Sequence, residues 1–147
     1  MESLHKSKVF IVEDHLQMRQ GLRKLLEFER DFQVCGEAGD VPGAIQGILE
    51  SRPDVAVVDL ELGSRNGLEV IQELQRRSRQ IPVLILSMHS ETLYAESALY
   101  RGAQGYVMKT ADPDEITYAL RRVLEGDIYL SSAVRQCLHS RHEGTHE

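Results

Sequence analysis

Short runs of apolar residues recur along the chain, and four of them end abruptly on a polar residue. Runs rich in β-branched residues, of this length, are typical of strands buried on both faces of a parallel sheet. A weaker alternating run at residues 32–38 predicts a further strand. The four sharper runs are residues 9–12 before Glu13 and Asp14, 55–58 before Asp59, 83–86 before Ser87, and 105–108 before Lys109.

Segments with helical spacing of apolar residues separate these runs. Residues 15 to about 30 predict the first helix, and Asp40 is suited to cap a second that stops at residues 51–54. Apolar positions at residues 68, 71 and 74 predict a third helix, which a glycine-containing loop at residues 60–67 precedes. Residues 91–101 predict a fourth helix.

The last helix has the clearest start signal. Asp112 is suited to the N-cap, Pro113 to the first helical position, and Glu115 to completing a capping box. Gly126 predicts the end of this helix. Residues 128–134 are compatible with the beginning of another helix.

Strands that alternate with helices predict an α/β fold with an open, doubly wound, five-stranded parallel sheet and five helices on its two faces. The 147 residues suit one domain, which we expect to span residues 1–130. Residues 131–147, which are rich in His and Glu near the end, are interpreted as the start of a linker or a disordered tail.

Composition narrows the function. The net charge of −6 and the pI near 5.5 argue against a large nucleic-acid footprint, which needs a basic patch. Cys35 and Cys137 are isolated, as in reduced intracellular proteins. Neither a signal peptide nor an apolar run approaching about 20 residues is apparent, so a cytoplasmic protein without a membrane association is expected.

The polar residues that follow the strands are expected to converge, because ligand sites of such sheets form beyond the carboxyl ends of the strands. Glu13, Asp14 and Asp59 would then share a pocket, and two charges at 4 Å repel by about 4 kcal/mol at an effective dielectric near 20. A hard cation such as Mg²⁺ relieves that repulsion. With Lys109 and Ser87, the set suits phosphoryl transfer to a carboxylate.

These residues, in this order and spacing, resemble the receiver domain of two-component response regulators. The resemblance covers roughly residues 8–130. The pieces that carry it are residues 9–15, Asp59 to Leu62 with Asn66 and Gly67, Leu86 with Ser87, and residues 105–109. The resemblance implies the flavodoxin-like strand order 2-1-3-4-5.

By this resemblance, Asp59 is the phosphoacceptor for a phosphoryl group from a histidine kinase, and the domain catalyses only its own phosphorylation and dephosphorylation. Asp14 and Asp59 would hold Mg²⁺ directly, together with the main-chain carbonyl of Glu61. Glu13, which stands where the family usually has aspartate, would act through a bound water. Lys109 would pair with the phosphoryl oxygens.

Two further positions match the family's conformational switch. Ser87 would move to hydrogen-bond the phosphorylated state, and Tyr106 would turn inward with it. Glu61 and His89 lie two positions after Asp59 and Ser87, where family members tune dephosphorylation. Thr110 follows Lys109 where many members have proline, so a cis peptide is not expected there.

Residues 13–15, 34–38 and 126–131 resemble receivers that are joined to a LuxR/NarL-type helix-turn-helix output domain. We therefore expect transcriptional control through a DNA-binding domain absent from this chain, with homodimerisation as a possible consequence of phosphorylation. A stand-alone receiver that acts in a phosphorelay or binds proteins is the alternative. A receiver-like module that binds partners without phosphorylation usually lacks an acidic residue or the lysine, and none is lost here.

A phosphatase of the haloacid-dehalogenase type is a less favoured reading. That family uses a second aspartate two residues after its nucleophile, where this chain has Glu61. The remaining polar residues are interpreted as structural. His15 and His89 lack metal-ligand spacing and are interpreted as flanking residues, and Arg121 and Arg122 as part of an exposed helix face. His139, His142 and His146 are interpreted as a solvated tail with weak metal affinity at most.

Overall fold

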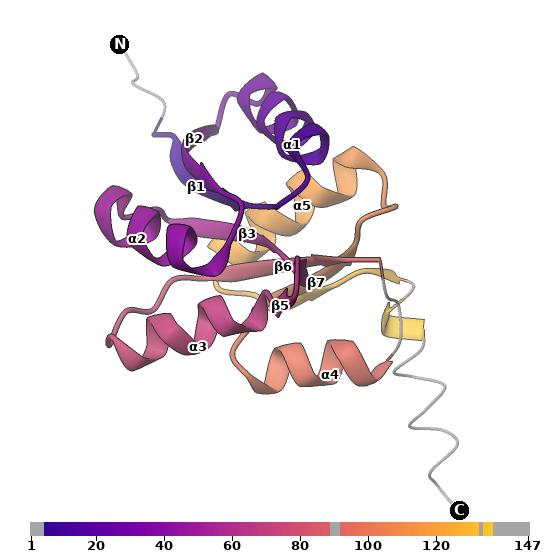
Figure 1. Ribbon diagram of the computed structural model, residues 1–147. Helices are drawn as coiled ribbons and strands as arrows, with labels where there is room; N and C mark the ends of the chain where they lie inside the picture. The colour runs from indigo at the N-terminus through magenta and orange to yellow at the C-terminus, as the bar shows by residue number, and fades with distance from the viewer. Residues whose placement is uncertain (1–4, 89–91, 133, 137–147) are drawn as a thin grey trace, which may run out of the picture.

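A central parallel sheet runs through the molecule, with helices on both of its faces (Figure 1). The computed structural model describes residues 5–88, 92–132 and 134–136. The strands of the sheet lie in the order β2-β1-β3-β6-β7-β8, and all of the neighbouring pairs are parallel. These strands are β1 (Ser7–Val12), β2 (Phe32–Ala38), β3 (Val55–Asp59), β6 (Val83–Ser87), β7 (Gly105–Met108) and β8 (Tyr129–Leu130).

The helices form two layers. Helices α1 and α5 pack on one face of the sheet, and α2, α3 and α4 on the other (Figure 1). None of the helices in the described part of the chain is long and apolar enough to cross a bilayer. The helices are α1 (Leu16–Phe28), α2 (Val41–Ser51), α3 (Leu68–Arg76), α4 (Thr92–Tyr100) and α5 (Pro113–Leu124).

Successive strand residues serve opposite layers of the core. In β3, Val55 and Val57 pack into the cluster formed with α1 and α5, whereas Ala56 and Val58 pack into the cluster formed with α2, α3 and α4. All five residues of β3 are buried, because helices cover both faces of the sheet. The predicted doubly wound fold and strand order are confirmed, with β2-β1-β3-β6-β7 as the five expected strands.

The segment after α5 differs from the prediction of another helix. Tyr129 and Leu130 form a short sixth strand that pairs with Gly105 and Tyr106 of β7. The N–H of Ser131 then donates to the carbonyl of Tyr106 (3.1 Å). A two-residue strand has no periodicity of its own, and the free edge of β7 decides its conformation. Helical backbone begins only at residue 132.

Residues beyond β8 also pack against the sheet. Val134 is completely buried in the core layer that includes Tyr106, and Ser131 is buried as well. Ser131 Oγ accepts a hydrogen bond from the N–H of Val134 (3.4 Å). The packed unit therefore continues past Leu130, where the sequence predicts its boundary.

Helix caps confirm part of the sequence analysis. Asp40 caps α2 by accepting a hydrogen bond from the N–H of Gly43 (2.7 Å). Asp112 caps α5, but its side chain accepts from the N–H of Asp114 (3.0 Å) and not from that of Glu115. The predicted capping box is wrong in this respect, because the cap closes one residue earlier than the box requires.

Candidate functional site

The carboxyl ends of β1, β3, β6 and β7 meet at one edge of the sheet. The N–H of Lys109 donates to the carbonyl of Ser87 (2.7 Å), and the N–H of Leu60 donates to the carbonyl of Leu86 (2.9 Å). These main-chain bonds join the ends of neighbouring strands. The polar residues that the sequence predicts to converge therefore do so, and Glu13, Asp59 and Ser87 are all buried.

Lys109 lies between two buried carboxylates. Its Nζ is 2.8 Å from Oδ2 of Asp59, to which it donates a hydrogen bond, and 2.8 Å from Oε1 of Glu13. Only 12% of the lysine side chain is exposed. One buried ammonium thus contacts two buried carboxylates. The cluster retains an excess negative charge, which favours binding of a further cation.

The electrostatics of the three groups follow from this arrangement. Burial raises the pKa of Asp59 to about 6; hydrogen bonds from Lys109 and the N–H of Glu61 oppose the shift only in part, and Glu13 adds to it. Burial also raises the pKa of Glu13, but hydrogen bonds from Lys109 and His15 outweigh it, so this pKa is lowered. Burial lowers the pKa of Lys109, but the two carboxylates overcome that effect and raise it.

The two oxygens of Asp14 have different surroundings. Oδ2 accepts a hydrogen bond from the N–H of Gly63 (2.9 Å), whereas Oδ1 is buried without a hydrogen-bond partner among the described residues. Oε1 of Glu13 is buried as well, and its partner is the Lys109 ammonium. Buried oxygens of this kind are the ligands that Mg²⁺ prefers, so the predicted site fits the ion.

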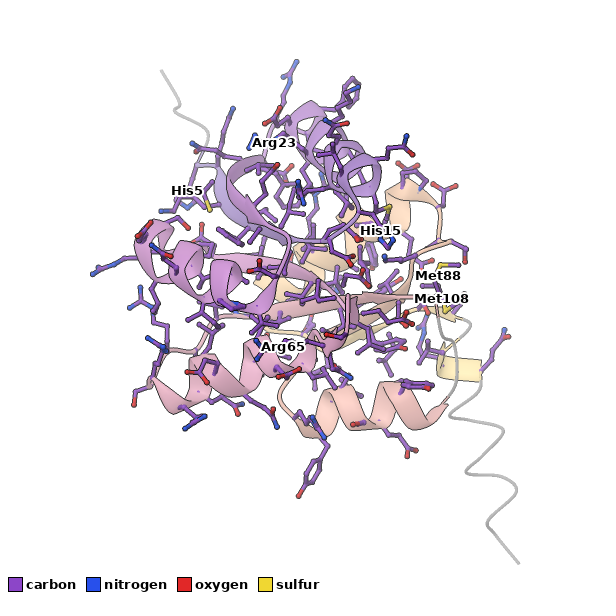
Figure 2. The ribbon with its side chains drawn as sticks, in the orientation of Figure 1. His5, His15, Arg23, Arg65, Met88 and Met108 are labelled. Carbon is purple, nitrogen blue, oxygen red and sulfur yellow. The ribbon has the colours of Figure 1, made fainter. Side chains whose placement is uncertain are left out.

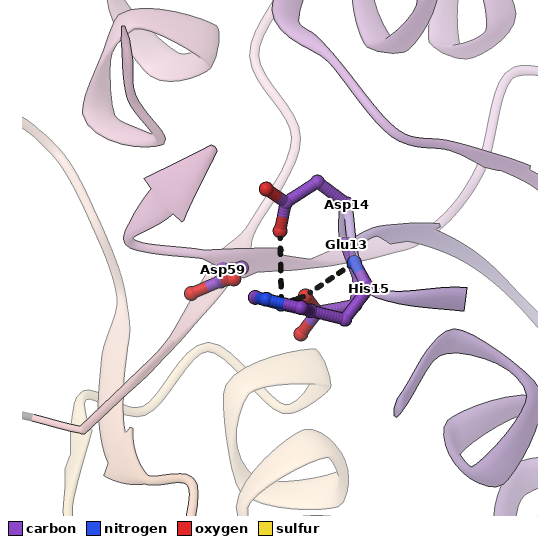
Figure 3. Close-up of side chains that lie close together, drawn as sticks. All are labelled: Glu13, Asp14, His15 and Asp59. Carbon is purple, nitrogen blue, oxygen red and sulfur yellow. Dashed lines mark hydrogen bonds and ion pairs between the residues drawn. The ribbon is translucent and has the colours of Figure 1, made fainter. Parts of the chain in front are cut away.

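His15 belongs to the same cluster, although the sequence analysis interprets it as a flanking residue. Glu13, Asp14, His15 and Asp59 each offer a ligand atom, and these four atoms lie within 4.8 Å of one another (Figure 3). Spacing along the sequence does not reveal this, because the chain turns between β1 and α1 and brings the imidazole back over the carboxylates. Adjacency to Asp14 is the only signal in the sequence.

A small hairpin occupies the segment after Asp59, which the sequence analysis describes only as a loop. Strands β4 (Glu61–Leu62) and β5 (Arg65–Asn66) pair in antiparallel fashion around Gly63 and Ser64. The N–H of Glu61 donates to Oδ1 of Asp59 (3.1 Å). The hairpin therefore orients the Asp59 carboxylate and, through Gly63, the Asp14 carboxylate.

Arg19 is a site-supporting residue that the sequence analysis does not identify. Its Nη1 donates to the main-chain carbonyl of Glu13 (2.8 Å), and its Nε donates to Oε1 of Glu37 (3.2 Å). Arg19 thereby fixes the peptide that carries the two N-terminal carboxylates. The signal for this role in the sequence is weak, since it consists of the position of Arg19 about one turn into the helix that follows Glu13 and Asp14.

Of the two predicted switch residues, Ser87 lies at the site, where its carbonyl accepts from the N–H of Lys109, and Tyr106 lies within the neighbouring strand β7. Tyr106 is completely buried, so its ring already occupies the interior between the sheet and α4. No cis peptide occurs among the described residues, in agreement with the expectation for Thr110. His89, for which a role in phosphoryl lifetime is predicted, lies outside the described residues.

Arg121 corrects another prediction. It is not simply part of an exposed helix face, because its guanidinium forms two hydrogen bonds to Asp31 (2.8 and 3.0 Å) and one to Glu29 (2.7 Å). The same group lies 5.2 Å from the ring centroid of Phe32. These contacts join α5 to the connection between α1 and β2, on the α1–α5 face of the sheet.

The chain belongs to the response regulator receiver domain family, whose pattern it matches over residues 9–121. Among curated relatives, it is 31% identical over 130 residues to the transcriptional regulatory protein DegU of Brevibacillus brevis, covering 88% of this chain and 55% of the relative. It is 35% identical over 140 residues to the DNA-binding transcriptional activator DevR/DosR of Mycobacterium tuberculosis, covering 95% of this chain and 64% of the relative. The chain thus spans little more than half the length of the first of these relatives.

Solved structures agree with this assignment. A LuxR-family two-component response regulator from Aurantimonas superposes with a TM-score of 0.88 at 31% identity, covering 93% of this chain and 99% of that one. The receiver domain of the putative regulator NarL from M. tuberculosis superposes with a TM-score of 0.79 at 30% identity, covering 83% and 98%. The chain is therefore a receiver domain of the LuxR/NarL type, and the haloacid-dehalogenase reading finds no support.

Proposed function

We propose that Asp59 accepts a phosphoryl group from a histidine kinase and that this modification switches the domain between two conformations. The single observation that carries the proposal is the contact between Asp59 and Lys109: a buried carboxylate at a strand end, with an ammonium 2.8 Å from one of its oxygens. The N–H of Glu61 bonds the other oxygen, so the carboxylate has a fixed orientation.

The chemistry expected of Asp59 is nucleophilic. Although burial raises its pKa to about 6, the group is mostly ionised at neutral pH and more basic than an ordinary aspartate. A carboxylate oxygen would form a bond to phosphorus as the bond from phosphorus to the imidazole nitrogen of the donor breaks. The leaving imidazole would keep the electron pair and take a proton. Lys109 would then neutralise charge on the phosphoryl oxygens.

Asp14, Asp59 and the main-chain carbonyl of Glu61 would hold Mg²⁺, and Glu13 would contribute through a water. When bound, Mg²⁺ supplies positive charge that offsets the carboxylates and the phosphoryl oxygens. Oδ1 of Asp14 supports this assignment, because it is buried and accepts no hydrogen bond from the described residues. Glu13 is held by Lys109 and His15, which suits an indirect role better than direct coordination.

Ser87 and Tyr106 would carry the signal. The main chain of Ser87 is bonded to Lys109, and Tyr106 pairs with β8, so both residues connect the site to neighbouring elements. An added phosphoryl charge would shift a balance of a few kcal/mol between two states. The expected consequences are altered surfaces at α4 and α5 and, in one version, homodimerisation.

The output that we propose is transcription, in the cytoplasm, through a DNA-binding domain outside this chain. The similarity to the transcriptional regulatory protein DegU and to the DNA-binding transcriptional activator DevR/DosR supports this proposal. The receiver would extend past residue 130, since Ser131 and Val134 are buried in its core, and the residues that follow would lead into a linker or tail. A stand-alone receiver in a phosphorelay remains the alternative.

The proposal is tested by intact-protein mass spectrometry after incubation with acetyl phosphate. We expect one phosphoryl mass gain in the wild type with Mg²⁺, and none without Mg²⁺ or in Asp59→Asn. A folded wild type without any gain would contradict the proposal and favour a module that acts without phosphorylation. Gain in the Asp59→Asn variant equal to that of the wild type would contradict the assignment of the residue.

A further inference from the structure

The chain that follows α5 is bonded to one of the predicted switch residues. We call residues 129–136 the β8 segment; all of them except residue 133 belong to the described part of the chain. The strand part of this segment pairs with Gly105 and Tyr106 of β7, and the N–H of Ser131 donates to the carbonyl of Tyr106 (3.1 Å). The β8 segment therefore holds the main chain of Tyr106.

The β8 segment runs toward the edge of the sheet that carries the site. Because β8 is parallel to β7, the segment proceeds toward the carboxyl ends of the strands, where Ser87 and Lys109 lie. Met88 and Met108, which directly follow Ser87 and precede Lys109, lie together at this edge (Figure 2). The segment thus connects this edge of the sheet to the chain beyond residue 136.

Beyond β8, the segment packs into the core. Ser131 precedes a helical turn, and its Oγ accepts a hydrogen bond from the N–H of Val134 (3.4 Å). The turn places the Val134 side chain in the same core layer as Tyr106 and the inner residues of α4. Val134 and Tyr106 are both 0% exposed. The segment and the switch ring therefore share one closed layer of the core.

Side chains that share a packed layer stabilise one another's positions. Because protein interiors are close-packed, a ring as large as that of Tyr106 leaves its place only when its neighbours move or a cavity opens. Val134 fills part of the same layer, and Ser131 bonds the peptide of Tyr106. The β8 segment is thus coupled to Tyr106 in two ways, through the main chain and through the core.

We propose that the β8 segment is a strap that holds the ring of Tyr106 in the interior of the unphosphorylated domain, and that displacement of the segment releases the ring. The inference rests on the proposed function only in naming Tyr106 as a switch residue, because the coupling itself needs no phosphoryl group. The simpler alternative is that the segment stabilises the domain as a whole, without a particular effect on Tyr106.

Nitration of tyrosine rings by tetranitromethane, followed by peptide mass spectrometry, measures how often Tyr106 becomes accessible. Tyr100 is the internal reference, because it is 93% exposed. The test compares Val134→Ala with Val9→Ala, both made in the full chain. Val9 is a matched control, because it is equally buried but belongs to the other core layer and to β1, which β3 and β6 separate from β7.

In the wild type, we expect Tyr106 to be nitrated at least about tenfold more slowly than Tyr100, since the ring reacts only when the structure opens. Val134→Ala should raise the rate at Tyr106 about five- to thirtyfold, the factor by which loss of a small buried side chain shifts such an opening. Val9→Ala should leave the rate within about twofold of the wild type, since it does not weaken the local opening. Ser131→Ala, which removes the acceptor for the N–H of Val134, should raise the rate as well.

A rate at Tyr106 that is unchanged in Val134→Ala would overturn the inference. An equal rise in Val134→Ala and Val9→Ala would also overturn it, because that result indicates opening of the whole domain. If Val134→Ala fails to fold, Ser131→Ala decides by the same criteria.

These outcomes are separate from those of the proposed function. Nitration is measured without a phosphoryl donor, whereas phosphorylation of Asp59 is measured by mass gain. A selective rise in Val134→Ala supports the strap even where acetyl phosphate produces no mass gain. The two claims thus fail independently.

Discussion

Gly67 lies so close to Asp59 that a Cβ on Gly67 would stand 2.0 Å from the main-chain oxygen of Asp59. The backbone of Gly67 has an ordinary helical conformation, so close approach and not a positive φ requires the glycine here. The N–H of Gly67 also donates to the carbonyl of Leu60 (2.6 Å). This bond joins the end of the β4–β5 hairpin to the residue that follows β3.

Gly67→Ala is therefore expected to destabilise the fold by about 2–3 kcal/mol, as overpacking commonly does, and to displace Asp59. Urea unfolding measures the first effect, and the rate of phosphorylation by acetyl phosphate measures the second. Gly21→Ala in α1 is the matched control, because no described atom outside its own stretch of helix lies within 4 Å of its Cβ position. An unchanged midpoint and rate in Gly67→Ala would contradict the account.

Lys109→Met should cost about 3 kcal/mol of stability at pH 7.5 without metal, because it leaves two buried carboxylates without their shared cation. The loss should shrink near pH 5, where Asp59 takes up a proton, and on addition of Mg²⁺. Urea unfolding at both pH values measures this. Lys24→Met on the exposed side of α1 is the control; a cost for Lys109→Met that does not depend on pH would argue against the charge explanation.

The pH dependence of Asp59 has a definite sign. Its pKa is about 6 in the folded protein and about 3.8 in the unfolded chain, so the folded state holds the proton more tightly. As pH rises from 4 to 7, metal-free wild type should therefore lose stability relative to Asp59→Asn, by about 2–3 kcal/mol in total. Thermal unfolding of both proteins across this range tests it; a difference that is flat or reversed would contradict the shift.

Arg121→Ala should destabilise the protein by about 1 kcal/mol near neutral pH, since the guanidinium pairs with Asp31 and Glu29 in a half-exposed setting. The hydrogen bond to Arg121 lowers the pKa of Asp31. The ion pair of Asp31 with Arg121 therefore stabilises the fold above pH 3.8, the ordinary pKa of aspartate. This stabilisation is lost as the pH falls through the lowered pKa that Asp31 has in the folded protein. Urea midpoints of the variant and the wild type should converge toward pH 3.

Arg122→Ala provides the comparison, because Arg122 pairs only locally, with Glu125 and Asp127, among the described residues. Its removal should cost less than that of Arg121. A constant difference between Arg121→Ala and wild type down to pH 3 would show that lost packing on Phe32, and not charge pairing, accounts for the effect.

Val134→Ala should cost about 1–2 kcal/mol, because Val134 is fully buried in the core layer with Tyr106. Arg135→Ala at the exposed neighbouring position should change little. Equilibrium unfolding of the two variants decides whether the segment after β8 is part of the folded unit; equal midpoints would leave the boundary at residue 130.

Local signals made much of this molecule predictable. The buried strands and the cap at Asp40 are encoded in residues close together in the sequence, and the rule for ligand sites of parallel sheets then brought Asp59 and Lys109 together. The strand β8 was not predictable, because two residues carry no period and β7 determines their pairing. The hairpin of β4 and β5 was not predictable for the same reason, because each of its strands has only two residues.

The directions of side chains were also not predictable from the sequence. The sequence indicates that His15 follows Asp14, but only the turn into α1 determines that Nδ1 lies over the carboxylates. Arg121 resembles any exposed helical arginine until α5 is docked beside the segment that carries Asp31. Both interactions depend on how elements pack, which periodicity alone does not specify.

The central claim is that Asp59, among the clustered carboxylates, forms the acyl phosphate. The most direct measurement is borohydride reduction after phosphorylation with acetyl phosphate and Mg²⁺, followed by peptide mass spectrometry, since reduction converts a phosphorylated aspartate to homoserine. The account predicts homoserine at position 59 and none at position 14, with Glu13 unmodified. Modification at Asp14 or Glu13 with Asp59 unchanged would contradict it.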